Sequence, residues 1–598
     1  MKGNGQLRQS QIITTYGPGA LIDLPRYSAI VAGLEQWPNT SLLEEIVEPR
    51  LTSKLRILTG IQSPRLYAPP AENNDPTKPD LGIVAYQFPE WFLVQEASDP
   101  DQRERSRRLV PRRALDDKGR FDGRAVIATR FVRACPKGHV DDVDWHGFVH
   151  GPDSGCPRTK QLWLDERGTG GDLADLYVRC ECGKQRSLYE ATQVEARPLG
   201  LCQGSRPWLG THANEECKEI SRLLTRTASN AYFPQVISVL SLPDIGGDLD
   251  GLVRELWDDL QIVDDLEGLN FIKRKPSIAA RLVGADLDNV LEAIKRVKHG
   301  VAESKPVKHA ELDAILSVPE GFGDDVPINQ NFHARRLPEH IWRNRPELSQ
   351  AIEAVIQVHR LREVLALVGF TRFEAYAPDI NGEFETDVAR ASLSREAEWL
   401  PAVENRGEGI FIQLRASAIA DWLARDGVKN RLDSLKNGHE LWASERKITR
   451  LFPGGPYILL HTLSHLLVQS MSMKCGYPAS AIRERIYANP EINQFGILLY
   501  TGSPDSEGTL GGLVQQGRYI ESHLADALTT GALCSNDPIC SSHVPSKSLE
   551  RRWLQGASCH GCALLAETSC EMRNDYLDRA LVVPVLGISD AAFFGRIT

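Results

Sequence analysis

Cysteines are the residues of this sequence best suited to chemistry, and they are strongly grouped. Six of the twelve lie within residues 135–217 and five within residues 534–570, whereas Cys475 stands alone between them. Thiolates brought together by short loops are typical ligands of zinc, and in a reducing compartment such groups indicate metal sites more often than disulfides. The grouping therefore predicts two zinc-binding regions.

The C-terminal group contains two short cysteine pairs separated by a longer loop. This pattern lets four sulfur atoms converge about 2.3 Å from one tetrahedral zinc ion and leaves no open position for a reacting water. We therefore expect structural zinc, with Cys570 as the surplus thiol and His543 and His560 as possible substitutes. The expected ligands are Cys534, Cys540, Cys559 and Cys562.

The N-terminal group is less regular. A single residue separates Cys180 from Cys182, which is tighter than the usual gap of two. One possible site combines Cys180, Cys182, Cys202 and Cys217, and another combines Cys135 and His139 with His150 and Cys156. At least one zinc site is expected here, and whether there is a second stays open.

A run of arginines at residues 103–113, RERSRRLVPRR, is a candidate contact for nucleic-acid phosphates. The alternative is a solvated loop or a disordered insert, because that is the usual state of a charge run. The net charge of -10 excludes non-specific coating of nucleic acid, so DNA binding would need a local basic patch. The candidate residues are Arg103, Arg105, Arg107, Arg108, Arg112 and Arg113.

Motifs typical of an enzyme are absent or weak. No G-x4-G-K-[ST] occurs, so the chain is not a P-loop motor. His461 and His465 share a helix face in HTLSH, but residue 462 is not Glu, so core histidines are expected rather than a zinc protease. Asp379, Glu383 and Glu385 are only weakly typical of a magnesium nuclease, because Glu385 stands where a lysine is needed.

The length of 598 residues predicts about three or four domains, and the composition is that of a folded, mixed α/β (α+β) multidomain protein. Neither an apolar run of about eighteen residues nor a signal-peptide core occurs, so a cytoplasmic protein without a membrane segment is expected. The expected regions are a β-rich region at 1–125, a cysteine-rich zinc-binding region at 126–245, a mainly helical region at 246–450 and an α/β zinc-binding domain at 451–598.

The spacing of apolar residues predicts the main elements of these regions. Helices are expected at 249–260, 287–297 and 348–368. Residues 457–472 are apolar on nearly every face, which indicates a buried helix, and residues 495–501 are expected to form a central strand. Arg-Gly-Glu-Gly at residues 406–409 is expected to be a structural turn.

Several segments spread along the chain carry a family resemblance: RQSQIITTYGPGALIDLP near the start, RFVRACPKGHVDDVDW from 130, CQGSRPWLG from 202, SNAYFP from 229, WLPAVENRGEGIFIQL from 399, HTLSHLL from 461 and CSSHVPSKSLERRWLQGASCHGCALLAETSCEMRNDYLDRALV from 540. Together they resemble the DrmB family, whose members are subunits of the DISARM anti-phage systems of bacteria. The C-terminal third also resembles the zinc-binding domain of MrfA-type DNA-repair helicases. That resemblance supports Cys534, Cys540, Cys559 and Cys562 as ligands and leaves Cys570 undecided.

The resemblance implies a partner, DrmA, a superfamily-two helicase that carries the ATPase motor. It implies that the chain is a non-enzymatic scaffold that contacts phage DNA through the complex, with a preference for ends or single-stranded overhangs. One alternative is a metal-dependent DNA nuclease or hydrolase that uses the carboxylates around Asp379. A further reading, compatible with the scaffold, is a regulator that blocks the access of DNA until the right substrate arrives.

Overall fold

The computed structural model describes residues 7–24, 27–70, 81–95, 105–151, 155–168, 171–210, 213–242, 252–253, 256–282, 287–299, 306–323, 331–376, 378–384, 389–446, 449–502, 512–547 and 551–596. The chain divides into two compact units. Unit 1 comprises Met1–Ile237, Leu365–Tyr376 and Glu385–Val403, and unit 2 comprises Ser238–Val364, Ala377–Phe384 and Glu404–Thr598. The long strands β16 (Ile352–Thr371) and β17 (Trp399–Leu414) contribute residues to both units.

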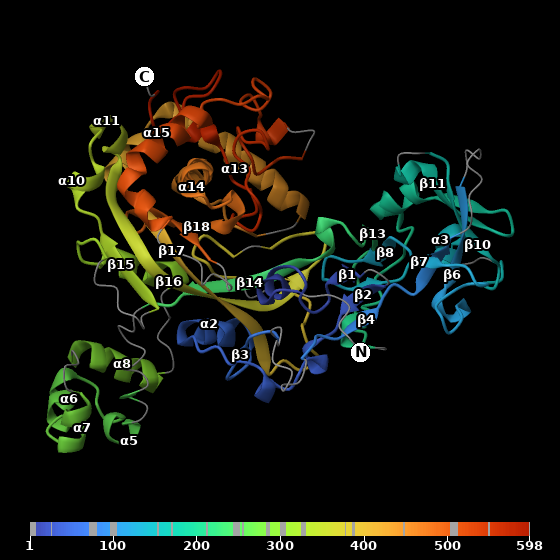
Figure 1. The fold of residues 1–598 in the computed structure, drawn as a ribbon, viewed down its shortest axis with the longest axis horizontal. Helices are drawn as coiled ribbons and strands as arrows, with labels where there is room; N and C mark the ends of the chain where they lie inside the picture. The colour runs from blue at the N-terminus through green and yellow to red at the C-terminus, as the bar shows by residue number, and fades with distance from the viewer. Residues whose placement is uncertain are drawn as a thin grey trace. The chain divides into compact units, whose positions relative to one another are not determined.

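The described part of unit 1 is built from short antiparallel strands (Figure 1). A six-stranded sheet has the order β12 (Gln185–Ser187), β11 (Leu176–Cys180), β10 (Leu162–Glu166), β6 (Arg105–Pro111), β5 (Trp91–Val94) and β7 (Val126–Ala128). One three-stranded sheet has the order β13 (Arg222–Thr225), β8 (Phe131–Ala134) and β9 (Val140–Asp141). Another has the order β1 (Leu21–Asp23), β2 (Ser28–Val31) and β4 (Ala85–Gln87). The helices α1 (Gln9–Thr14), α2 (Pro49–Thr59) and α3 (Trp145–His150) accompany them, and β3 (Arg65–Tyr67) pairs with β17.

Unit 2 is centred on a sheet and a buried helix. Strands β15 (Phe332–Arg336), β16, β17, β19 (Gln494–Thr501) and β18 (Ile482–Asn489) pair in that order, with β14 (Phe233–Leu240) also beside β16. Helix α14 (Gly454–Cys475) packs in one core with residues of these strands and of α12 (Ala416–Leu423), α13 (Asp426–Arg446) and α15 (Ile520–Gly531) (Figure 1). The predicted buried helix at 457–472 and the predicted strand at 495–501 are confirmed.

Shorter helices occupy the middle of the chain. They are α5 (Trp257–Leu260), α6 (Leu266–Ile272), α7 (Pro276–Arg281), α8 (Leu287–His299), α9 (Val307–Leu316), α10 (Glu339–Trp342) and α11 (Pro346–Ser349). Helix α8 confirms the prediction for residues 287–297. Of the helix predicted at 249–260, α5 and residues 252–253 are helical, and Asp248, its expected cap, lies outside the described residues.

Two local predictions were wrong. Residues 352–371 form the strand β16 rather than a helix, because an apolar run that is buried on both faces of a sheet also satisfies helical spacing. Residues 406–409 lie inside β17 rather than in a turn. Glycine at position 407 allows the neighbouring strand β19 to approach β17 closely, because a Cβ on Gly407 would lie 1.7 Å from the carbonyl oxygen of Thr501.

The described part of the C-terminal segment at 532–596 contributes side chains to the core although it contains little regular structure. The short helical turns η11 (Pro545–Lys547) and η12 (Arg579–Leu581) are the helical elements that the structure describes there. Ala580, Leu581 and Val582 nevertheless lie fully inside the core around α14. Interactions other than the backbone hydrogen bonds of helices and strands must therefore hold this segment in place. Across the described helices of the chain, none is long and apolar enough to cross a membrane.

Candidate metal centres

Cysteine and histidine side chains converge in the described residues at positions far apart in the sequence. In each group the potential ligand atoms all lie within 4.8 Å of one another. The groups that contain the predicted cysteines are Cys135, His139, Cys202 and Cys217; His150, Cys156, Cys180 and Cys182; and Cys534, Cys540, Cys559 and Cys562. Each offers four protein ligands, as a closed structural zinc site requires.

The C-terminal group has the spacing of a tetrahedral thiolate site. The Sγ atoms of Cys534 and Cys559 lie 3.4 Å apart, those of Cys559 and Cys562 lie 3.6 Å apart, and those of Cys540 and Cys562 lie 3.8 Å apart. Four sulfur atoms at about 2.3 Å from zinc are about 3.8 Å from one another, so this group fits the ion. The residues are those predicted from the sequence.

A buried cation lies close to this thiolate group. Arg579 is fully buried and pairs with Asp537. The pKa of Cys540 is lowered to about 5, first because the Cys562 thiol hydrogen-bonds to it and also because the Arg579 guanidinium is nearby. The same contact raises the pKa of Cys562. Within the group, the thiolate form, which is the form that binds metal, is therefore favoured at Cys540.

The first N-terminal group is centred on His139. Its Nδ1 atom lies 3.3 Å from Cys135 Sγ and 3.5 Å from Cys202 Sγ. On its other side, Nε2 lies 2.6 Å from Glu215 Oε1, and Glu215 in turn pairs with Arg206 at 2.9 Å. A carboxylate behind a metal-binding imidazole fixes the tautomer that leaves the inner nitrogen free for the ion.

Glycine allows the chain to turn tightly beside this group. Gly204 has a φ of +66°, and a Cβ there would lie 1.7 Å from the carbonyl oxygen of Glu215. Its N–H donates to Cys202 Sγ over 3.3 Å. Hydrogen bonding from the Cys135 thiol lowers the pKa of Cys202 to about 4. Local backbone geometry and side-chain contacts therefore both prepare Cys202 to be a thiolate ligand.

The second N-terminal group joins the end of a helix to the end of a strand. Cys156 Sγ lies 3.8 Å from Cys180 Sγ, the last residue of β11, and Cys182 Sγ lies 3.8 Å from Nε2 of His150, the last residue of α3. Trp145 and Phe148 of α3 pack with Val178 of β11 in one core, which sets the two ends side by side. Cys182 is exposed, so one edge of this group faces solvent.

Comparison with known proteins assigns the chain to a family. Residues 463–563 match the MrfA Zn-binding domain, and residues 8–233 match a domain of unknown function, DUF8724. The chain is 32% identical to the DISARM protein DrmB of Bacillus paralicheniformis over 486 residues, which is 79% of this chain and 83% of that protein. The chain belongs to the DrmB family. Zinc is accordingly its cofactor, and the match to the zinc-binding domain contains all four cysteines of the C-terminal group.

In this DrmB-family chain, the predicted arrangement of the N-terminal ligands was wrong. Cys202 and Cys217 join Cys135 and His139, whereas Cys180 and Cys182 join His150 and Cys156. The reason lies in the sheets: Cys135 follows β8 of the three-stranded sheet, and Cys180 ends β11 of the six-stranded sheet. Linear spacing does not reveal which sheet carries which pair.

Other residues near the centres were missed or set aside by sequence reasoning. Glu215 and Arg579 support ligands without being ligands, and no spacing rule identifies such residues. Cys570 lies outside the four-cysteine group, as expected of the surplus thiol. His461 and His465 are buried, as expected of core histidines, but they lie beside Cys570 and Glu484, which was not anticipated.

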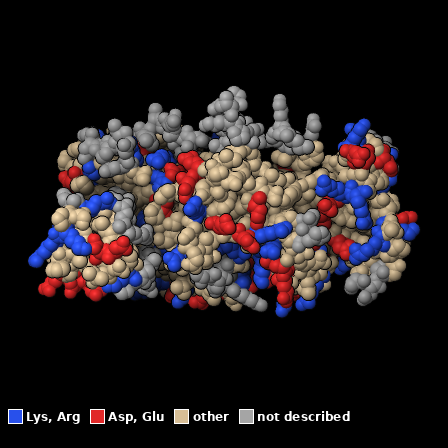
Figure 2. Space-filling model, turned by 90° about the horizontal axis from the view of Figure 1, so that it is seen from below, with Lys and Arg blue, Asp and Glu red and all other residues tan. Residues whose placement is uncertain are grey.

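Within the arginine-rich segment, residues 105–111 form strand β6 rather than a loop or a disordered insert. Arg107 pairs with Glu166 at 2.5 Å, Arg108 lies over the Phe121 ring, and Arg112 lies 3.7 Å from Glu90. Arg105 and Arg113 are exposed, and Arg103 lies outside the described residues. Basic and acidic side chains are intermixed on the face drawn in Figure 2. Acidic neighbours therefore neutralise part of the charge of this segment.

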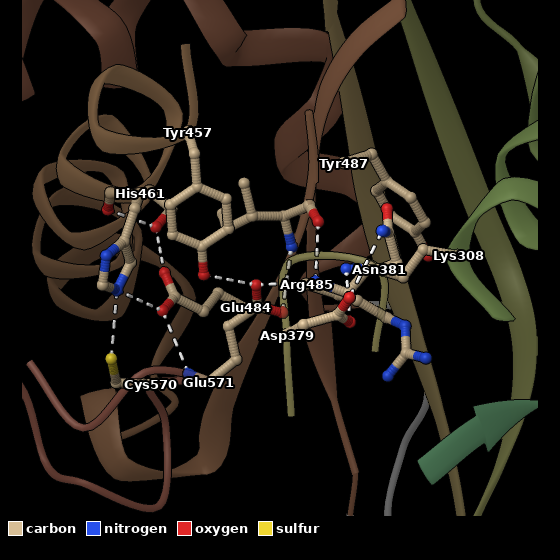
Figure 3. Close-up of polar contacts among 12 residues, drawn as sticks. Lys308, Asp379, Asn381, Tyr457, His461, Glu484, Arg485, Tyr487, Cys570 and Glu571 are labelled. Atoms are coloured by element: carbon tan, nitrogen blue, oxygen red, sulfur yellow. Dashed lines mark hydrogen bonds and ion pairs between the residues drawn. The ribbon is translucent and has the colours of Figure 1, made fainter. Parts of the chain in front are cut away.

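The carboxylates proposed for a nuclease form a turn. Oδ1 of Asp379 accepts the N–H group of Asn381 at 2.9 Å (Figure 3). It also accepts the N–H group of Glu383 at 2.8 Å. Oε1 of Glu383 accepts the N–H of Val307 at 3.1 Å, and Glu385 lies outside the described residues. In the described part of the chain, Asp379 is in none of the groups whose ligand atoms converge. Its contacts are those of a structural turn.

Proposed function

We propose that the chain is a subunit of a DISARM defence complex that has no motor of its own, binds a DrmA-like superfamily-two helicase and helps it to engage phage DNA. The observation that carries this proposal is the 32% identity to the DISARM protein DrmB over 79% of the chain. The absence of a P-loop motif from the sequence supports a role beside a separate ATPase.

The metal centres support a scaffold rather than a catalyst. In this proposal each of the three groups that contain the predicted cysteines holds one zinc ion through four protein ligands. A zinc ion without an open position cannot activate water, but its binding free energy stabilises the fold. Such a framework would hold the surface that meets the helicase.

The isolated chain should contact DNA only weakly. Its net charge is -10, and Arg107 and Arg112 of the arginine-rich segment face acidic partners. Arg105 and Arg113 are exposed and remain the best candidates for phosphate contacts, with Arg103 beside them in the sequence. The helicase would supply the remaining basic surface.

Co-purification tests this function directly. The chain, produced with a DrmA-like helicase, should remain bound to it through size exclusion, and the chain alone should hydrolyse no ATP. The complex should bind DNA with overhangs more tightly than the chain does. Failure to bind any DrmA-like helicase would overturn the proposal. Magnesium-dependent DNA cleavage by the purified chain that Asp379→Ala abolishes would overturn it in favour of the nuclease.

The arginine contribution has its own comparison within the complex. Arg105→Ala with Arg113→Ala should weaken DNA binding and lower the slope of log affinity against log salt by about 0.9 for each phosphate that the protein no longer neutralises. Arg56→Ala, which also removes an exposed arginine from unit 1, is the control and should leave the slope unchanged. Equal slopes for both variants would exclude this segment from the DNA path.

A further inference from the structure

A fourth group of potential ligands lies in the interior of unit 2, apart from the cysteine centres. His461 and His465 come from one face of α14, Glu484 comes from β18, and Cys570 comes from the C-terminal segment. All four residues are buried, with exposed fractions between 0% and 7%. Figure 3 shows His461, Glu484 and Cys570 directed toward one another.

The contacts within this group are short. His461 Nε2 lies 3.1 Å from Cys570 Sγ and 3.0 Å from Glu484 Oε1. His465 Nε2 lies 3.3 Å from the same Glu484 oxygen, and the ligand atoms of all four residues are within 4.8 Å of one another. Nitrogen, oxygen and sulfur ligands of one tetrahedral zinc ion lie about 3.3–3.8 Å apart, so shifts of a few tenths of an ångström would accommodate an ion.

The outer contacts of His465 determine what its inner nitrogen can do. Its Nδ1 atom lies 2.7 Å from the carbonyl oxygen of Ala563, so Nδ1 carries the hydrogen. A neutral ring then presents a lone pair from Nε2 toward the Glu484 carboxylate. The nitrogen and the carboxylate oxygen are then both hydrogen-bond acceptors, and a cation bound between them removes their mutual repulsion. The Nδ1–carbonyl contact is also the support that metal-binding histidines usually have.

Both acidic ligands accept hydrogen bonds from nearby donors. Cys570 Sγ accepts the N–H of Asn574 over 3.1 Å. Glu484 accepts the Ser464 hydroxyl through Oε2, and its Oε1 accepts the N–H of Glu571 over 3.2 Å. Hydrogen bonds donated to a carboxylate or a thiolate favour the charged form. A buried carboxylate beside a buried thiolate needs positive charge to offset the cost of desolvation.

Lys308 is engaged by a different carboxylate, that of Glu571. Lys308 Nζ and the Tyr457 hydroxyl both donate to Glu571 Oε1 over 2.7 Å, and the N–H of Ile486 donates to Glu571 Oε2 over 3.2 Å (Figure 3). Lys308 thus compensates Glu571, which is the residue after Cys570. Lys308 is therefore engaged with Glu571 rather than with Glu484.

We propose that His461, His465, Glu484 and Cys570 bind a fourth zinc ion. Imidazole, carboxylate and thiolate are all zinc ligands, and this mixture is unlike the oxygen-rich sites of magnesium or calcium. Two neutral histidines, one carboxylate and one thiolate together balance the charge of a divalent cation, which suits a site without solvent. Four protein ligands make the site structural.

The site would fasten the C-terminal segment to the core. Residues 569–578 follow the four-cysteine centre and reach α14 and β18 without regular secondary structure. The N–H of Glu484 donates to Ser569 O over 3.1 Å, and the N–H of Asp578 donates to Thr462 Oγ1 over 2.9 Å. A metal ion between these contacts would join three distant parts of unit 2, and it does not depend on the helicase proposal.

The zinc content of the full-length chain, purified without chelator, tests the site. We expect four zinc ions per chain, one for each convergent group, and one fewer in Cys570→Ser and in His465→Gln. His523→Gln is the matched control, because His523 is a fully buried histidine of unit 2 outside every group in the described residues. A loss of zinc in the control equal to that in the variants would contradict the assignment.

Diffraction at the zinc absorption edge on crystals of the unaltered chain keeps the test decisive if the variants do not fold. An anomalous peak among the four side chains would establish the site. Peaks at the three cysteine centres with none here would overturn the proposal and leave a metal-free pair of Glu484 and a protonated His461.

Discussion

The metal centres of unit 1 and unit 2 differ in what surrounds them. In unit 1 two of the ligands, Cys135 and Cys180, lie at the ends of the strands β8 and β11, which already pair in sheets, and Cys182 is exposed. In unit 2 the four-cysteine centre lies in a segment with little regular structure, whose apolar side chains enter the core around α14. Zinc in unit 1 would add stability to sheets that already form, whereas zinc in unit 2 would hold a segment that has few backbone hydrogen bonds of its own.

The largest effect should follow from removing the four-cysteine centre. In Cys559→Ser with Cys562→Ser, we expect the C-terminal segment to unfold and the soluble yield and helicase binding to fall sharply. Zinc binding contributes about 10–16 kcal/mol in zinc-finger peptides, as much as the about 5–15 kcal/mol that stabilises a whole domain. Soluble yield, zinc content and co-purification measure the outcome.

Cys475→Ser is the control for this variant, because Cys475 belongs to no convergent group in the described residues. It should keep the zinc content and the yield of the unaltered chain. If the double variant loses one zinc but unfolds at the same temperature, the C-terminal segment does not depend on metal and the contrast between the units fails.

A smaller and more local effect is expected in unit 1. Cys135→Ser with Cys202→Ser should lose one zinc and more than about 4 kcal/mol of local stability, because a closed site becomes a pair of ligands. Hydrogen exchange should rise in β8, β9 and β13, while α14 and β19 of unit 2 keep their protection. Exchange that rises equally in both units would show that their metal centres are not independent.

The C-terminal centre could be predicted from the sequence because its chemistry is local. Two short cysteine pairs and one loop define the site, so spacing alone identified all four residues. Helix α14 was predictable for a similar reason: apolar residues lie on nearly every face of it, so it is expected to be buried whatever its neighbours are. Local pattern and tertiary environment agree in both cases.

Features that depend on distant pairing could not be predicted. The N-terminal ligands were grouped wrongly because the pairing of β8 and β11 in separate sheets decides which ligands meet. Strand β16 was taken for a helix because its side chains are buried on both faces of the sheet, so that the strand lacks an alternating pattern. The partnership of His461 with Glu484 and Cys570 unites α14, β18 and the C-terminal segment, which no spacing connects.

Supporting residues should have a smaller effect than ligands. In Glu215→Ala, which removes the carboxylate 2.6 Å from His139 Nε2, zinc affinity at that centre should fall about 10–100-fold because the imidazole loses its orientation. Competition with a coloured chelator measures the affinity. Glu216→Ala, which removes the neighbouring carboxylate paired with Lys218, is the control and should change nothing. Equal losses in both variants would indicate a general charge effect.

The smallest expected effect separates acid destabilisation of unit 2 from the release of zinc. His523 is fully buried, its Nε2 donates to Gln516 over 2.9 Å, and its Nδ1 accepts from Ser470 over 3.2 Å, so both nitrogens are satisfied in the neutral ring. Burial, with a smaller contribution from Lys474, lowers its pKa to about 4. The unfolded chain, with a histidine pKa of about 6.5, therefore binds more protons between these values, and stability falls as the pH falls.

At pH 5.5 the free energy of unfolding should be about 1 kcal/mol lower than at pH 7 through His523 alone. His523→Gln should remove that part of the pH dependence, while acid release of zinc, which requires protonation of thiolates, continues in both proteins. Urea unfolding at both pH values, with zinc content measured alongside, distinguishes the two effects. If the free energy of unfolding falls equally in the variant and in the unaltered chain between pH 7 and pH 5.5, His523 does not cause the acid sensitivity of unit 2. That sensitivity then comes from the metal centres, and only zinc distinguishes unit 2 from unit 1.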